Sequence, residues 1–147
     1  AAPRQGEEPV SGAACELVAR CFAARTTMHL AHLASKTYAI HMALGDFYDA
    51  IATAADEFAE CWMGVYGQMA VTDFPALRLQ TSDPITQLSD LRTWIAANRE
   101  EACEKYEDND DADGAESNDV DCTELANLID NILAVIDRAV YKLKFLR

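Results

Sequence analysis

Long apolar runs, C-x-x-C pairs and clustered basic residues are all missing from this 147-residue sequence. No stretch reaches the roughly 18 consecutive apolar residues of a membrane-spanning helix, so we expect no membrane insertion. Lysine and arginine total 12, against 25 aspartate and glutamate residues. Contacts with nucleic-acid phosphates need clustered positive charge, so direct nucleic-acid binding is not expected.

The five cysteines have none of the close spacing that is typical of zinc sites. Residues 1–10 lack the apolar segment of a signal peptide, and we expect them to be a flexible segment ahead of a single domain at residues 11–147. An odd cysteine count without a secretion signal favours a cytoplasmic protein with buried, reduced thiols. The alternative is a metal or disulfide cluster near one end of the domain, formed by Cys15, Cys61, Cys103 and Cys122.

Proline is absent from residues 13–65, and Gly45 is the only glycine there among many good helix formers. One helix of that length would be about 80 Å long, too long for a domain of this size. We therefore predict two antiparallel helices, at about residues 12–34 and 37–66. Serine or threonine can cap the second helix at residues 35–37, after a possible cap for the first helix at Ser11.

The rest of the chain predicts two more helices and a long connection. Residues 68–81 contain a proline and no regular apolar pattern, apart from a short helical turn expected around residues 74–77. About 15 extended residues can run the full length of a bundle. Helices are predicted at about residues 83–106 and 122–146, separated by an acidic loop at 107–121. The sequence thus predicts an all-α four-helix bundle whose second and third helices run parallel.

Apolar residues at helical spacing indicate which face of each helix lies in the core. The expected core residues are Leu17, Val18, Phe22, Ala23 and Leu33 in the first helix; Ile40, Leu44, Phe47, Ile51, Phe58, Trp62 and Val65 in the second; Ile85, Leu88, Leu91, Trp94 or Ile95, and Ala102 in the third; and Leu125, Leu128, Ile129, Ile132, Val135, Ile136, Val140 and Leu143 in the fourth.

A second stripe on the second helix carries His41, Asp56 and Glu60. Asp56 and Glu60 are one helical turn apart and can bind one metal ion together. His41 lies 15 residues before Asp56, or about 22 Å along the helix, so one chain cannot close the site. An antiparallel two-fold partner would set its own His41 beside these carboxylates. The alternative is that the carboxylates are solvated, while His29, His32 and His41 cap or fill the hairpin end.

The pattern H-x11-H-x5-FYD-x6-DEFAE-x6-G, over residues 29–67, resembles the core of Dps-type miniferritins in the ferritin-like superfamily. The resemblance implies a ferritin-like bundle with a long crossover between the second and third helices. It also implies a ferroxidase site in which His29 and His41 of one subunit and Asp56 and Glu60 of another bind iron and oxidise Fe(II). The implied assembly is an iron-storing dodecamer with two-fold interfaces, and His32 is an additional candidate ligand.

Several residues depart from the miniferritin pattern. Leu30 stands where tryptophan is usual, Gly45 where an acidic residue is frequent, and Cys61 where arginine is common. The Glu-x-x-His pair of conventional ferritins is absent. The H-L-x-H-L segment and the FYD triplet also resemble an uncharacterised group of small bacteriophage-encoded proteins, found in the host cytoplasm or the virion. The alternative function is therefore a non-enzymatic, phage-encoded bundle with a structural or interaction role.

Residues 104–121 hold nine acidic residues and one lysine, and we expect a solvated, mobile loop there. Asn109, Asp111 and Asp113 match the first half of an EF-hand loop, but Val120 stands at the position of its final glutamate. Specific calcium binding is therefore not expected. The negative field of the loop could instead attract ferrous ions toward the proposed sites.

Overall fold

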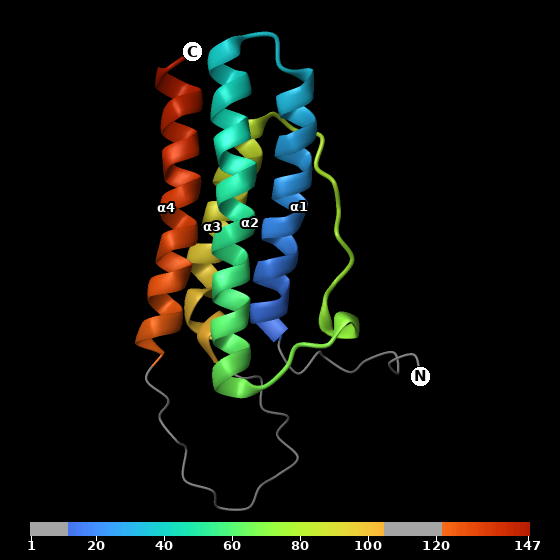
Figure 1. The fold of residues 1–147 in the computed structure, drawn as a ribbon, viewed down its shortest axis with the longest axis vertical. Coiled ribbons are helices and arrows are strands. Elements are labelled where there is room, and N and C mark those ends of the chain that lie inside the picture. The colour runs from blue at the N-terminus through green and yellow to red at the C-terminus, as the bar shows by residue number, and fades with distance from the viewer. Residues whose placement is uncertain (1–11, 105–121) are drawn as a thin grey trace, which may run out of the picture.

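The computed structural model describes residues 12–104 and 122–147, which contain four α-helices, one 3₁₀ turn and no strand. The elements are α1 (Gly12–Ala34), α2 (Tyr38–Tyr66), the 3₁₀ turn η1 (Val71–Asp73), α3 (Pro84–Cys103) and α4 (Thr123–Phe145). The helices form a bundle (Figure 1). None of the described helices combines the length and the apolar character that crossing a membrane requires. The expected flexible segment at 1–10, the cap at Ser11, and the acidic loop at 107–121 with its partial EF-hand lie outside the described residues.

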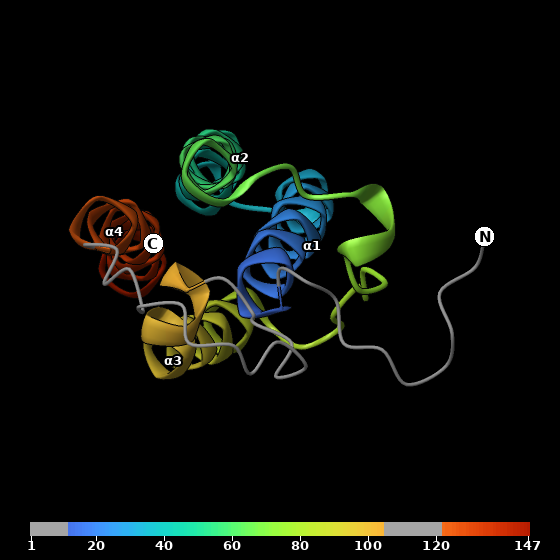
Figure 2. The ribbon, with the colours of Figure 1, turned by 90° about the horizontal axis from the view of Figure 1, so that it is seen from below.

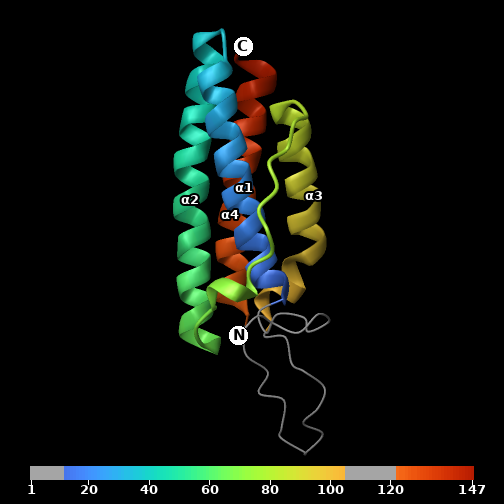
Figure 3. The same ribbon diagram turned by 90° about the vertical axis from the view of Figure 1, so that its right-hand side faces the viewer.

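Seen along its axis, the bundle has one helix at each corner of a square (Figure 2). α1 packs against α2 and α3, and α4 packs against the same two helices. The connection between α2 and α3 runs alongside α1 to the far end of the bundle (Figures 1 and 3). As a result, α2 and α3 run in the same direction, opposite to α1 and α4.

Short polar side chains fix where the helices begin. Thr37 caps α2 by accepting a hydrogen bond from the backbone N–H of Ile40 (3.4 Å). Asp83 caps α3 in the same way, accepting from the N–H of Thr86 (3.0 Å). Gly67 ends α2 with φ at 107°, a conformation that other residues rarely adopt. The Thr37 cap lets α2 begin only four residues after the end of α1, so the α1–α2 turn is a short hairpin end.

Two expected limits differ from the structure. The 3₁₀ turn lies at Val71–Asp73 rather than around residues 74–77, because the Asp73 carboxylate accepts a hydrogen bond from the N–H of Ala70 (2.8 Å). α3 ends at Cys103 rather than near residue 106, and the N–H of Glu104 bonds only three residues back, to the carbonyl of Glu101 (3.2 Å). The other expected helix limits lie within one residue of those observed.

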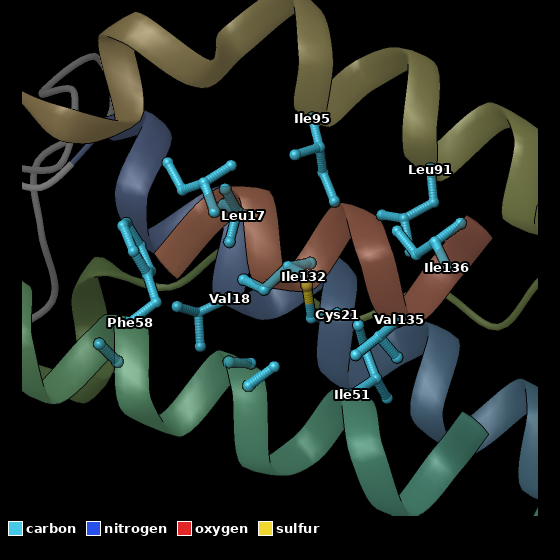
Figure 4. Packing of buried hydrophobic residues seen from close by; sticks show 14 of the residues in the cluster. Leu17, Val18, Cys21, Ile51, Phe58, Leu91, Ile95, Ile132, Val135 and Ile136 are labelled. Carbon is cyan, nitrogen blue, oxygen red and sulfur yellow. The ribbon is translucent and has the colours of Figure 1, made fainter. Parts of the chain in front are cut away.

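Apolar side chains from all four helices meet in the centre of the bundle (Figure 4). Three residues expected in the core lie outside it: Leu33 is 68% exposed, Val65 is 44% exposed, and Ala23 is partly buried but does not pack against the core cluster. Leu33 and Val65 belong to the last turns of α1 and α2: the α1–α2 turn extends beyond the start of α3, and at the opposite end α2 extends beyond the start of α1 (Figures 1 and 3). Helical spacing predicts the direction in which a side chain points, but it does not reveal whether another helix covers that level of the bundle.

Ion pairs at the surface join neighbouring helices. Arg92 and Arg99 of α3 bond to Asp137 (2.6 Å) and Asp130 (2.8 Å) of α4. The hydrogen bond from the Arg99 guanidinium lowers the pKa of the Asp130 carboxyl below its usual value. Because these pairs are partly exposed, each contributes at most about 1 kcal/mol to stability.

Candidate metal centre

All three histidines lie around the α1–α2 turn, where the sequence places them. His29 and His32 belong to the last two turns of α1, and His41 to the first turn of α2. The rings of His32 and His41 are stacked, with centroids 3.6 Å apart and planes at 22°. His29 meets His32 edge-on, with centroids 6.0 Å apart. His32 therefore stands between the two histidines that the miniferritin pattern identifies as ligands.

Tyr48 extends this cluster of rings along α2. Its ring stacks on His29, with centroids 4.1 Å apart, and meets His32 edge-on at 5.3 Å. The sequence signal for this contact is spacing, since Tyr48 lies seven residues after His41 and so two turns along the same face of the helix. The stack holds the His29 imidazole against α2, and it ties the last turns of α1 to the start of α2.

Two reciprocal hydrogen bonds fix the orientation of His32 and His41. Nδ1 of His32 bonds to the carbonyl oxygen of His41 (2.6 Å), and Nδ1 of His41 bonds to the carbonyl oxygen of His32 (3.0 Å). A carbonyl oxygen can only accept, so each Nδ1 carries the proton, and Nε2 of the neutral ring keeps a free lone pair. His32 and His41 are both only partly buried. Metal-binding histidines use this arrangement, in which one ring nitrogen is anchored by a carbonyl and the other is available.

Gly45 provides the space that His32 occupies. A Cβ at position 45 would lie 3.2 Å from Cε1 and 3.3 Å from Nδ1 of His32, closer than ordinary contact. An imidazole of the same chain therefore lies directly beside Gly45. The serine of the turn supports this placement, because the Ser35 hydroxyl donates a hydrogen bond to the His32 carbonyl (2.8 Å).

The carboxylates of the predicted site lie elsewhere on α2. Asp56 and Glu60 are exposed and one turn apart. α2 is continuous, so His41 and Asp56 are about 22 Å apart along its axis. Within residues 12–104 and 122–147, no three or more His, Cys, Asp and Glu side chains are grouped so that they could hold a metal ion. The structure therefore brings the histidines together and leaves the two carboxylates apart from them in the same chain.

Large apolar side chains surround the histidines at the hairpin end and are open to solvent. Tyr38 is 79% exposed, and Leu30, Leu33 and Met42 are exposed as well. Several exposed apolar side chains at one place on a molecule are typical of a surface that contacts another molecule. The candidate histidine ligands thus lie within a surface that is suited to a partner.

Comparison with known proteins yields one match. No curated protein and no solved structure matches the chain. A match to a protein family covers residues 32–143, a span that includes His32, His41, Asp56 and Glu60 but begins after His29. Because this match covers more than half of the sequence, the chain belongs to the family of unknown function DUF5856.

Proposed function

We propose that the protein is a Dps-like iron-binding protein that oxidises Fe(II) at sites shared across a two-fold dimer interface and stores or detoxifies the iron. The observation that carries this proposal is the pair of anchored imidazoles. Backbone carbonyls hold Nδ1 of His32 and His41, so their Nε2 atoms are available to a metal ion at the exposed hairpin end. A shared site requires each chain to carry its histidines and its carboxylates at two separate places, and this chain does so.

Each proposed site combines side chains of two subunits. His29 and His41 of one subunit would bind Fe(II) together with Asp56 and Glu60 of the other, and His32 is an additional candidate ligand. An antiparallel partner would bring the histidine end of one α2 beside the acidic end of the other, which is favourable in charge as well as in geometry. Imidazole combined with carboxylate is a donor set that suits iron.

The topology supports this proposal. The connection alongside α1, the parallel α2 and α3, and the packing of α1 and α4 against both of these helices fit a ferritin-like bundle with a long crossover. A dodecameric shell, as in miniferritins, would hold the ferric product. Two Fe(II) ions lose one electron each, and hydrogen peroxide takes up both electrons and two protons to form two water molecules.

Anaerobic Fe(II) titration, followed by peroxide addition, tests the proposal when the mass of the assembly is measured on the same sample. We expect saturable Fe(II) binding and a rapid rise in ferric absorbance in a large oligomer. The variant Asp56→Asn/Glu60→Gln should lose saturable binding and keep its helical circular dichroism.

Asp49→Asn/Glu57→Gln provides the matched control. It removes the same charge from the same helix, but these two residues line the groove toward α4. The control should bind Fe(II) like the unmodified protein. Equal loss of binding in both variants would show that general acidity attracts iron, and a monomeric protein would contradict a shared site.

The second candidate function is that of a non-enzymatic bundle, a phage-encoded structural or interaction protein, and the exposed apolar hairpin end favours it. In that case the hairpin end serves assembly alone. Leu33→Glu would then disrupt the oligomer, while Asp56→Asn/Glu60→Gln would change neither assembly nor Fe(II) uptake. Saturable binding that depends on Asp56 and Glu60 would exclude this candidate.

A further inference from the structure

A second polar cluster lies at the opposite end of the bundle, where α2 and α3 end and α4 begins (Figure 1). The Tyr66 hydroxyl donates a hydrogen bond to the carbonyl oxygen of Cys103 (2.6 Å). The Cys122 thiol donates to the same oxygen (3.3 Å), and its sulfur lies 3.7 Å from the Tyr66 hydroxyl. The Cys103 carbonyl thus joins the ends of α2 and α3 to the start of α4. It also places the Cys122 side chain next to a second cysteine, Cys103.

The two thiols differ in their surroundings. The Cys103 side chain is buried, and burial raises its pKa to about 11, so it stays protonated at neutral pH. Cys122 is only partly buried. Both residues line a cavity of about 430 Å³ that also touches Arg99, Glu100 and Asn127. A small oxidant in this cavity reaches the more exposed thiol first.

The other cysteines are placed differently. Cys15 and Cys21 are fully buried on α1, and burial raises the pKa of Cys21 to about 12. Cys61 on α2 is partly buried, as Cys122 is, but it does not line the cavity. No disulfide joins any of the five cysteines, all of which lie in the described residues. The carbonyl-linked pair is therefore distinct among the thiols of the chain.

We propose that Cys103 and Cys122 form a redox-active pair, in which hydrogen peroxide oxidises Cys122 and Cys103 then closes a disulfide. In the first step the Cys122 sulfur attacks peroxide, the O–O bond breaks, and a sulfenic acid and one water molecule form. In the second step the Cys103 sulfur attacks the Cys122 sulfur and releases a second water molecule. Two thiols lose two electrons in total, and one peroxide molecule gains them.

Local geometry favours the second step. The Cys122 sulfur already lies 3.3 Å from the carbonyl oxygen of Cys103, so the two cysteines are neighbours where α3 ends and α4 begins. The proposed bond then requires the Cys103 side chain to turn toward Cys122. The bond would tie the end of α3 to the start of α4 and close residues 104–121 into a covalent loop. This site goes beyond the proposed iron chemistry and needs none of its ligands.

Oxidation of the full-length protein in the presence of EDTA tests the pair independently of iron. After peroxide treatment and alkylation of the remaining thiols, peptide mass spectrometry should find Cys103 linked to Cys122. The linked protein should melt at a temperature higher by about 5 °C or more than the reduced form. Cys103→Ser should leave a sulfenic acid on Cys122 that dimedone traps, because no thiol resolves it.

Cys61→Ser is the matched control, since it removes one partly buried thiol and should leave the 103–122 link unchanged. Cys122→Ser should abolish the link while circular dichroism shows an intact bundle. The proposal is overturned if peroxide links other cysteines instead, or if dimedone labels Cys61 as fast as Cys122 in the Cys103→Ser variant. Either result leaves the iron proposal unaffected.

Discussion

At the hairpin end, His32 and His41 bond to carbonyls nine residues away in the chain, whereas at the opposite end Tyr66 and Cys122 reach Cys103 across 37 and 19 residues. The first set of bonds follows from a single turn between two helices. The second set exists only because three helices end or begin together.

The two ends also differ in hydration. Burial raises the pKa of Cys103 to about 11 and is the main cause that raises the pKa of Tyr66 to about 12. The three histidines, in contrast, are only partly buried. We infer that the hairpin end is arranged to present ligands to a partner, while the opposite end joins the helices and shields one thiol of its pair.

The largest expected effect is a loss of stability at alkaline pH, caused by the Cys103 thiol and the Tyr66 hydroxyl. Cys103 and Tyr66 have ordinary values of 9.0 and 10.0, so the unfolded chain releases protons that the folded protein retains. The contribution of these two groups to the free energy of unfolding should therefore be fully present below about pH 9 and be lost as the pH rises toward 12. Urea unfolding at several pH values measures this fall.

The double variant Cys103→Ala/Tyr66→Phe isolates the contribution of this end. Its unfolding free energy should fall less steeply between pH 9 and 12 than that of the unmodified protein, because Cys21 is then the one acid with a raised pKa left in the described part of the chain. Equal slopes for the two proteins would mean that this end is not desolvated in solution.

A smaller effect is expected when one hydroxyl is removed from each end. Tyr66→Phe should lower the free energy of unfolding by about 1 kcal/mol, because the Cys103 carbonyl loses its shorter hydrogen bond. Ser35→Ala should cost less, since the His32 carbonyl still accepts from His41 Nδ1 and from the backbone N–H of residue 35. Chemical denaturation of both variants gives the comparison. A larger cost for Ser35→Ala would reverse the proposed contrast.

The smallest effect concerns the contact between His32 and Gly45. Gly45→Ala gains up to about 1 kcal/mol of helix propensity, but its Cβ crowds the His32 ring, so the net change should be near zero. In a His32→Ala background the same substitution should stabilise by about 0.5–1 kcal/mol. A double-mutant cycle by urea denaturation measures this coupling. Additive effects would show that His32 does not rest on Gly45.

Local sequence patterns predict most of the fold of this chain. The break at residues 35–37 and the caps at Thr37 and Asp83 are set by neighbouring residues, so sequence reasoning predicts the helix limits closely. Leu33 and Val65 show where it fails, because apolar spacing contains no information about which helix ends extend past their neighbours. The bundle topology depended on the length of one connection.

The candidate site, like the fold, has features that the sequence predicts and features that it does not. Histidine spacing predicts that His29, His32 and His41 share one end of a hairpin, since each position follows from helix geometry. The reciprocal Nδ1 bonds and the stacking of Tyr48 on His29 were not predictable, because they depend on how two helices rotate against each other. The hydrogen bond from Tyr66 to Cys103 was even less predictable, because predicting it requires the positions of α2, α3 and α4 along the bundle axis.

The most direct test of the shared site is subunit complementation. His41→Ala and Asp56→Asn/Glu60→Gln chains are each expected to bind no Fe(II) at the shared sites when purified alone. When the two chains are co-expressed and pair at random, one site in every mixed dimer has all its ligands, so about one quarter of the unmodified stoichiometry should return. Fe(II) binding that stays at the background of the separate variants would contradict a site built from two subunits.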